Sequence, residues 1–196
     1  MGLSNIDIQK RRLRARQRLR IKSLSSASRS AKARRILECL LRWDIYRKAR
    51  KILLFASLKD EPDTWSLLKK SLRLKKQVYL PAICTDGSLG IYRVKNVETD
   101  LIPGEFDVWE PRKLKKNLSL LSKMDLALIP GLAFDFQGRR LGRGKGCYDR
   151  LLAAKKKPFC LGLAFEAHLV KKIPEAKNDQ RVQGIQTEKA LYYVFG

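Results

Sequence analysis

The sequence feature that most constrains this chain is a glycine-rich run between residues 129 and 150, which reads IPGLAFDFQGRRLGRGKGCYDR. Near its end, three glycines alternate with Arg143 and Lys145, and Tyr148 and Asp149 follow. Alternating glycines let a backbone turn tightly and expose its N–H groups, while the cations add positive charge. Asp149 offers a carboxylate to a metal ion. The run therefore indicates a loop that binds a nucleotide polyphosphate.

Two common phosphate-binding loops do not fit this run. A Walker A loop fails because Arg139 stands at its first glycine and Gly146 at its Ser/Thr. A dinucleotide fingerprint fails because Cys147 stands at its last glycine. The alternative is a glycine-rich turn with incidental charges. The close packing of glycines, cations, an aromatic ring and an acid argues against that alternative.

Strand-like and helix-like segments alternate along the chain. We expect helices over about residues 6–22, 30–41 and 148–154, with a serine-rich break over residues 23–30. We expect strands over residues 52–56, 78–80, 89–94, 126–129 and 159–164. Pro81 is expected to stop the second strand, and Thr64 to cap a helix that carries Trp65, Leu68 and Leu72.

This alternation predicts an α/β fold: a single three-layer α/β/α domain over residues 1–196 with a mostly parallel, Rossmann-like central sheet. The basic helical segment over about residues 1–50 is expected to pack on that domain. The glycine-rich loop is expected between a strand and a helix. Ligands bind beyond the carboxyl ends of the strands in such sheets, so the loop lies where a site is expected.

The positive charge is extreme and uneven. The net charge is +24, and residues 1–51 hold 17 Lys and Arg against three acidic residues, about +14. Such a field attracts nucleotides, polyglutamylated cofactors, nucleic acids and acidic membrane surfaces. A solvated basic face explains the charge equally well. Within the same segment, Lys10, Arg14 and Arg18 share one helix face over about 12 Å and are expected to reach phosphates.

Membrane and secretory signals are absent from the sequence. No apolar run reaches the roughly 18 residues that a membrane span needs, and no apolar stretch follows the basic N-terminus. The four cysteines lie far apart, without a C-x-x-C pair, and are expected to be free thiols in a reducing cytoplasm: Cys39, Cys84, Cys147 and Cys160. His168, the one histidine, is expected in a surface position or a turn.

The glycine-rich run resembles the signature of the 5-formyltetrahydrofolate cyclo-ligase family, also called 5,10-methenyltetrahydrofolate synthetase. The match runs over residues 130–150, with Cys147 where a tyrosine is usual. Weaker similarities cover most of the rest of the chain: the basic helix over residues 10–18, the segment FASLKDEPDT at 55–64, Leu80-Pro81, the aromatic pattern at 106–111, and Pro174, Asp179, Thr187 and Glu188.

The resemblance implies an ATP- and Mg²⁺-dependent closure of 5-formyltetrahydrofolate to 5,10-methenyltetrahydrofolate. In that reaction the formyl oxygen takes the γ-phosphate, N10 closes on the activated carbon, and phosphate leaves. Such phosphoryl transfer depends on positioning and charge neutralisation, which Lys145, Arg140 and Arg143 would supply. The implied ATP contacts are Lys10, Arg14, Arg140, Leu141, Gly142, Arg143, Gly144, Lys145, Gly146, Cys147 and Tyr148.

The resemblance also implies the folate and metal sites. Ala56, Glu61 and Tyr148 would contact the substrate, and Asp149 would hold Mg²⁺. Glu61 and Asp149 also suit an ordinary first-turn helix acid. Phe106 and Trp109 are candidate walls for the pterin ring, although aromatic residues at this spacing also suit a core.

Two positions depart from the family pattern. Gln183 stands where an aspartate associated with the metal is usual, which leaves Asp149 as the one expected protein ligand. Cys147 stands where a tyrosine is usual, so this chain lacks that aromatic ring beside the folate. The second hypothesis is a nucleic-acid-binding or moonlighting member without cyclo-ligase activity, which the basic N-terminal segment motivates and the intact loop disfavours. We expect a monomer whose partner is the small-molecule substrate.

Overall fold

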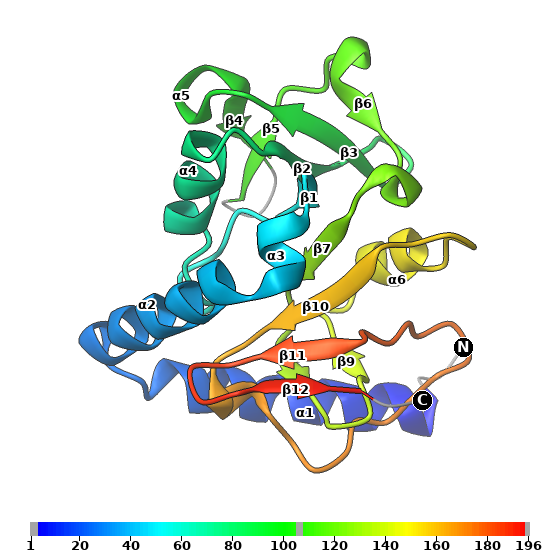
Figure 1. Cartoon of the computed structure of the whole chain (residues 1–196). Coiled ribbons are helices and arrows are strands. Elements are labelled where there is room, and N and C mark those ends of the chain that lie inside the picture. The colour runs from blue at the N-terminus through cyan, green and yellow to red at the C-terminus, as the bar shows by residue number, and fades with distance from the viewer. Residues whose placement is uncertain (1–3, 105–107, 195–196) are drawn as a thin grey trace.

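A central sheet of eight strands organises the chain (Figure 1). The computed structural model describes residues 4–104 and 108–194. The strand order is β12-β11-β10-β7-β1-β2-β3-β6. The strands are β1 (Lys51–Leu53), β2 (Gln77–Ile83), β3 (Leu89–Val94), β6 (Leu118–Ser119), β7 (Leu126–Ile129), β10 (Phe159–Leu163), β11 (Gly184–Gln186) and β12 (Leu191–Tyr193). The five strands from β11 to β2 run parallel, whereas β12, β3 and β6 run antiparallel to their neighbours.

Apolar side chains cover both faces of this sheet. All four residues of β7 are buried, because Leu126 and Leu128 point to one face while Ala127 and Ile129 point to the other. The first face packs against α2 (Ser26–Arg42), α3 (Asp44–Lys48) and α4 (Trp65–Arg73). The second packs against α6 (Cys147–Leu152), η3 (Leu121–Lys123) and β8 (Ala133–Phe134). The predicted three-layer α/β class with a mostly parallel sheet is confirmed.

Helix α1 (Asn5–Lys22) covers the short hairpin of β8 and β9 (Arg140–Leu141), beside which it runs in Figure 1. Leu13 packs with Ala133, Leu141 and Ile173 in a small separate core. The side-chain amide of Gln17, a buried residue of α1, donates hydrogen bonds to the carbonyls of residues 167 and 168. These contacts fix which face of α1 turns inward. No helix in the described ranges combines the length and the apolar character needed to cross a membrane.

One predicted helix start and one predicted capping contact need correction. Helix α2 begins at Ser26 rather than near residue 30, because the Ser25 side chain accepts the backbone N–H of Ser28 and caps the helix there. Thr64 does precede α4, but its hydroxyl donates to the carbonyl of Phe55 instead of capping. Asp63 accepts the first N–H groups of α4 in its place. Thr64 therefore ties the helix to the segment that follows β1.

The prediction that Pro81 stops a strand is wrong, because Pro81 lies inside β2 and opposite Ile91 of β3. Just beyond the end of β2, the N–H of Cys84 donates to the carbonyl of Ser88. Because successive backbone N–H groups point to alternate sides of a strand, the nitrogen atoms of Pro81 and Ile83 point away from β3. On that side β1 has already ended, at the residue that pairs with Tyr79. Pro81 therefore interrupts no ladder hydrogen bond.

The glycine-rich loop leaves a hairpin and not the main sheet. After β7, the chain forms β8 and β9, and the loop then joins β9 to α6. The expected strand and helix on either side of the loop are present, but the strand is only two residues long. A second hairpin, β4 (Leu101–Pro103) with β5 (Trp109–Pro111), lies outside the main sheet as well. The remaining short helices are α5 (Val97–Asp100), η2 (Lys115–Asn117) and η4 (Glu166–His168).

Candidate active site

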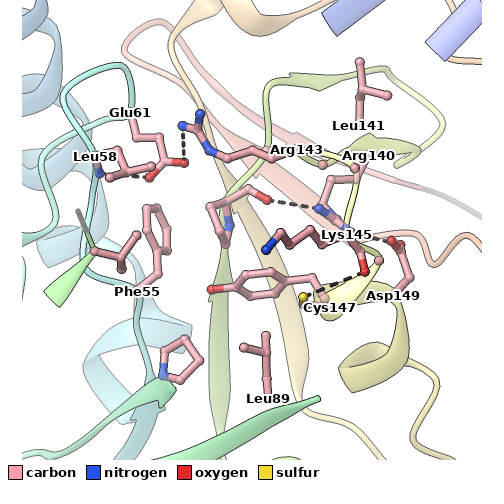
Figure 2. Close-up of a pocket in the computed structure, with 18 of the residues that line it drawn as sticks. Phe55, Leu58, Glu61, Leu89, Arg140, Leu141, Arg143, Lys145, Cys147 and Asp149 are labelled. Carbon is pink, nitrogen blue, oxygen red and sulfur yellow. Dashed lines mark hydrogen bonds and ion pairs between the residues drawn. The ribbon is translucent and has the colours of Figure 1, made fainter. Parts of the chain in front are cut away.

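A pocket of about 640 Å³ opens at the carboxyl ends of the parallel strands (Figure 2). Phe55 and Ala56 enter it after β1, Pro130 and Gly131 after β7, and Ile83 from the end of β2. Every site residue expected from the sequence lines it: Lys10, Arg14, Ala56, Glu61, Arg140, Leu141, Gly142, Arg143, Gly144, Lys145, Gly146, Cys147, Tyr148 and Asp149. Residues far apart in the chain therefore meet where an α/β sheet is expected to bind ligands.

The glycine-rich loop forms one wall of the pocket, and its glycines are needed for two reasons. Gly144 has a φ of +117° and Gly146 a φ of +65°, a region in which other residues are strained. At Gly142 the reason is space for the Arg140 side chain, because a Cβ atom at this position would lie 2.7 Å from Nη1 of Arg140. Gly146 ends the loop and α6 begins at the next residue.

Arg140 lies under the loop as the partner of Asp149. Its side chain is only 3% exposed, and its Nη2 donates to Oδ1 of Asp149 at 2.9 Å. The guanidinium also lies 5.6 Å from the centre of the Tyr148 ring. Its Nε is buried without a hydrogen-bond partner in the part of the chain that the structure describes. Burial raises the pKa of Tyr148 far above its ordinary value, so this hydroxyl stays protonated.

Arg143 crosses the pocket to the opposite wall. Its Nη2 donates to Asp60 at 2.6 Å and to Glu61 at 3.0 Å. Glu61 also accepts the backbone N–H of Leu58 at 3.1 Å, and its side chain is only 8% exposed. Burial raises the pKa of Glu61, and the charge of Arg143 opposes part of that rise. The loop is thus joined to the segment between β1 and α4 (Figure 2).

The basic row of α1 forms a third wall. Lys10 is paired with Asp179, whose carboxylate also accepts the N–H of Ala176 at 2.8 Å. Arg14 donates from Nε to the carbonyl of Gly142 at 2.9 Å. Arg18 lines the pocket as well. The three side chains all line the pocket, as expected for one helix face, and that they reach phosphates stays a prediction.

Lys145 lies in the exposed part of the loop, and the half-buried Cys147 follows as the first residue of α6. Lys145 is exposed and extends toward the middle of the pocket in Figure 2. The Sγ of Cys147 lies 3.7 Å from Nη2 of Arg150. All four cysteines, which lie in the described ranges, are free, as expected. Of the two aromatic residues proposed as pterin walls, Trp109 lines the pocket and is 47% exposed, whereas Phe106 lies outside the described residues.

The expectation of a surface position for His168 is wrong, although the residue does lie in a turn. His168 is fully buried in η4, where it stacks on Phe165 and its Nδ1 accepts that residue's N–H at 3.0 Å. Its Nε2 has no hydrogen-bond partner in the described ranges. Burial lowers the pKa of His168 to about 4. The histidine is therefore neutral at ordinary pH and does not line the pocket.

Gln183 does not take the place of a ligand in the pocket. Its side-chain oxygen accepts the N–H of Cys160 in β10 at 2.8 Å, and it is not among the described residues that line the pocket. Asp179 does line the pocket, and the next residue, Gln180, donates its N–H to Asp149 at 3.3 Å. A glutamine at position 183 thus removes no carboxylate from this pocket.

Sequence reasoning assigned no role to three acidic residues that line the pocket, Asp7, Glu110 and Asp179. Asp179 contacts Lys10, and Asp60, which contacts Arg143, lies outside the lining. Glu110, which is 5% exposed, accepts the N–H of Ile83 at 3.2 Å. Asp179 stood in the closing sequence pattern, which was a usable signal. Asp60 and Glu110 stood in the similar segments at 55–64 and 106–111, which were signals of the same kind.

The pocket fits a metal–nucleotide complex better than a metal ion bound by protein alone. No group of three or more His, Cys, Asp or Glu side chains within residues 4–104 and 108–194 is arranged to hold a metal ion. Mg²⁺ often takes one or two carboxylates and completes its shell with phosphate oxygens and water. Both hydrogen bonds to Asp149 end on Oδ1. The donor set therefore suits Mg²⁺ that arrives with phosphates.

A glycine-rich loop with cations, at the carboxyl edge of an α/β sheet, defines a class of nucleotide-using enzymes. The model of the 5-formyltetrahydrofolate cyclo-ligase family matches residues 7–188, and the chain belongs to this family.

Similar proteins span about three quarters of the chain or more. A 5-formyltetrahydrofolate cyclo-ligase of Mus musculus is 28% identical over 96% of this chain and 98% of its own length. One from Escherichia coli (strain K12) is 30% identical over 74% of this chain and 81% of its own length. The structure of Aquifex aeolicus 5,10-methenyltetrahydrofolate synthetase is 29% identical, with a TM-score of 0.84 over 95% of this chain and 93% of that one.

Proposed function

We propose that this chain converts 5-formyltetrahydrofolate to 5,10-methenyltetrahydrofolate with ATP, and releases ADP and phosphate. The observation that carries the proposal is the pocket, in which the glycine-rich loop, the row on α1 and Glu61 line a single cavity. Family membership supports the same activity and gives no support to the nucleic-acid-binding alternative. The basic face of the chain then serves to attract anionic substrates.

The triphosphate would lie between the loop and α1. Gly142, Gly144 and Gly146 let the backbone approach closely, while Lys145 and Arg14 supply positive charge. Such charges, fixed before reaction, stabilise the charge that develops during phosphoryl transfer. Arg140 is enclosed and paired, so its contribution is to orient Asp149 and Tyr148.

Mg²⁺ would be held by Asp149, with Asp179 as the other carboxylate on this side of the pocket. When bound, the ion would neutralise phosphate charge and orient the transferred group. Asp149 is already oriented by Arg140 and by the N–H of Gln180. Asp179 is oriented by Lys10 and by the N–H of Ala176. The protein thus fixes both carboxylates before the metal–nucleotide complex arrives.

The folate would occupy the other half of the pocket, toward Ala56, Glu61 and Trp109. Glu61 is a buried acceptor for the N–H donors at the edge of a pterin ring, and Trp109 offers an exposed aromatic face. Tyr148 also lines the pocket, and in this arrangement it would separate the two substrates. The formyl oxygen takes the γ-phosphoryl group, N10 bonds to the activated carbon and loses its proton, and phosphate leaves with the oxygen. No nucleophilic serine, cysteine or histidine is required.

The activity is tested by mixing the purified chain with 5-formyltetrahydrofolate, ATP and Mg²⁺, and following the absorbance of the methenyl product. We expect a signal that grows only when all three are present, with one ADP per product. No signal, with both substrates bound, would contradict the proposed reaction. We further propose that the chain acts as a monomer in the cytoplasm. The four free thiols support this location, and sedimentation of the active protein tests its mass.

A further inference from the structure

Arg143 connects two neighbouring carboxylates, of which Glu61 lines the opposite wall of the pocket and Asp60 lies outside the lining. It pairs with Asp60 at 2.6 Å and with Glu61 at 3.0 Å, through the same nitrogen, Nη2. The exposed fractions differ: 34% for the Asp60 side chain and 8% for Glu61. We call these three side chains the Arg143 latch. Its closed form is visible in Figure 2, where Arg143 meets Glu61.

The latch joins groups that the proposed function assigns to different substrates. Arg143 belongs to the loop that would bind the triphosphate, and Glu61 to the wall that would bind the folate. While the latch is closed, Nη2 of Arg143 is not available to phosphate oxygens, and Oε1 of Glu61 is not fully available to a pterin edge. Asp60 lies on the same segment as Glu61 but has no part in either proposed substrate contact.

We propose that Asp60 is a positioning residue, which together with Glu61 holds Arg143 between the two substrate sites, so that each substrate binds more tightly once the other has opened the latch. The inference rests on the proposed function. It adds a role for Asp60 and a coupling between ATP and 5-formyltetrahydrofolate that the individual contacts do not require.

The physical reason is that opening the latch costs free energy only once. A pterin edge that donates to Oε1 of Glu61 replaces one of the two bonds of Arg143, and a phosphate that accepts from Nη2 of Arg143 replaces both. Whichever ligand binds first spends part of its binding free energy on this exchange. The second ligand does not, and thermodynamic linkage makes the gain equal for both ligands.

Burial makes the exchange at Glu61 specific. Because the side chain of Glu61 is 8% exposed, loss of Arg143 without a replacement would leave a buried carboxylate with the N–H of Leu58 as its remaining bond. A ligand with N–H donors supplies that replacement. Asp60, being one-third exposed, is solvated by water when Arg143 leaves. Asp60 can therefore hold the arginine in the free protein and release it at small cost.

The test measures binding without turnover. Isothermal titration gives the Kd of a non-hydrolysable ATP analogue with Mg²⁺, and of 5-formyltetrahydrofolate, each alone and each in the presence of saturating other ligand. We expect each ligand to tighten the other by about fivefold or more. In Asp60→Asn, we expect the ATP analogue alone to bind up to about fivefold more tightly, and the coupling factor to fall.

The direction of the Asp60→Asn effect separates positioning from a structural role. A residue that merely stabilised the site would weaken binding of the ATP analogue when it is changed. Glu38→Gln, which removes one negative charge from an exposed position on α2, is the matched control and should leave both affinities and the coupling unchanged. Two ligands that bind independently in the wild type, or weaker analogue binding in Asp60→Asn, would overturn the inference. Failure of both ligands to bind would instead overturn the proposed function on which it rests.

Discussion

Nη2 of Arg140 donates to Oδ1 of Asp149 at 2.9 Å, and this bond closes the glycine-rich loop at its base. Arg140 belongs to β9 and Asp149 to α6, so the pair joins the two elements between which the loop runs. The carbonyl of Gly142 is held by Arg14 from α1. The loop is thus fixed at its base and its start, although three of its residues are exposed.

Asp149→Ala is expected to weaken both the protein and its use of metal. The change leaves Arg140, whose side chain is 3% exposed, as an unpaired buried charge. The free energy of unfolding should therefore fall by about 3 kcal/mol, measured by denaturant unfolding. The KM for Mg-ATP should rise in the same variant, because the proposed metal ligand is lost.

A double variant separates these two effects. Arg140→Leu with Asp149→Leu removes both charges, so the free energy of unfolding should recover most of the loss. The KM for Mg-ATP should stay raised. A double variant as unstable as Asp149→Ala would show that the pair does not account for the destabilisation, and one with the wild-type KM for Mg-ATP would contradict the metal role.

Lys145→Ala is expected to slow turnover by about 100-fold or more, because one fixed positive charge near the transferred phosphate is lost. Lys145 is exposed, so the midpoint of thermal unfolding should change little. Steady-state rates of the methenyl product measure the effect, and Lys145→Arg should restore part of the rate. Lys69→Ala, at an exposed position on α4, is the control. Wild-type turnover in Lys145→Ala would refute the role of this lysine.

Gly146→Ala and Gly87→Ala form a matched pair. Gly146 has a φ of +65° and Gly87 a φ of +75°, and an added Cβ would face Arg150 in both cases. Each variant should lose about 1 kcal/mol of stability. Only Gly146 lines the pocket, so only Gly146→Ala should raise the KM for ATP. Equal kinetic effects in the two variants would mean that backbone strain acts through the fold and not through the loop.

His168 is expected to make the fold sensitive to acid. Burial lowers its pKa from 6.5 to about 4. Between these values the unfolded chain binds a proton that the folded chain does not, so the free energy of unfolding falls as the pH falls. The contribution of His168 to the free energy of unfolding is fully present above about pH 6.5. By about pH 4, about 3 kcal/mol of it is lost.

The measurement compares denaturant unfolding at about pH 7.5 and about pH 5, where the loss due to His168 should be about 2 kcal/mol. His168→Gln removes the titrating group and keeps an acceptor for the N–H of Phe165. Between the two pH values, the free energy of unfolding of His168→Gln should fall by about 2 kcal/mol less than that of the wild type. Equal losses would place the acid sensitivity in the carboxylates, including Asp60 and Glu188 near this histidine.

The local sequence predicted the elements whose apolar pattern is unambiguous. The four buried residues 126–129 form β7 as expected, because a wholly apolar run bounded by Pro130 suits a strand covered on both faces. The sequence pattern failed at Pro81, because the general tendency of proline to end a strand does not hold there. Pro81 is tolerated inside β2 because its neighbour β1 has ended, and that is a property of the sheet and not of the residues around Pro81.

The sequence by itself determined the fold class, the family and the residues of the loop, because glycines, cations and an acid at fixed spacing can be read without a fold. Only the tertiary structure decided how these residues are paired. Arg140 and Arg143 have the same charge, yet one is enclosed against Asp149 and the other crosses the pocket to Asp60 and Glu61. Burial likewise separated His168 from the surface. Pairing and burial depend on elements distant in the chain, which the packing of α1 and the sheet brings together.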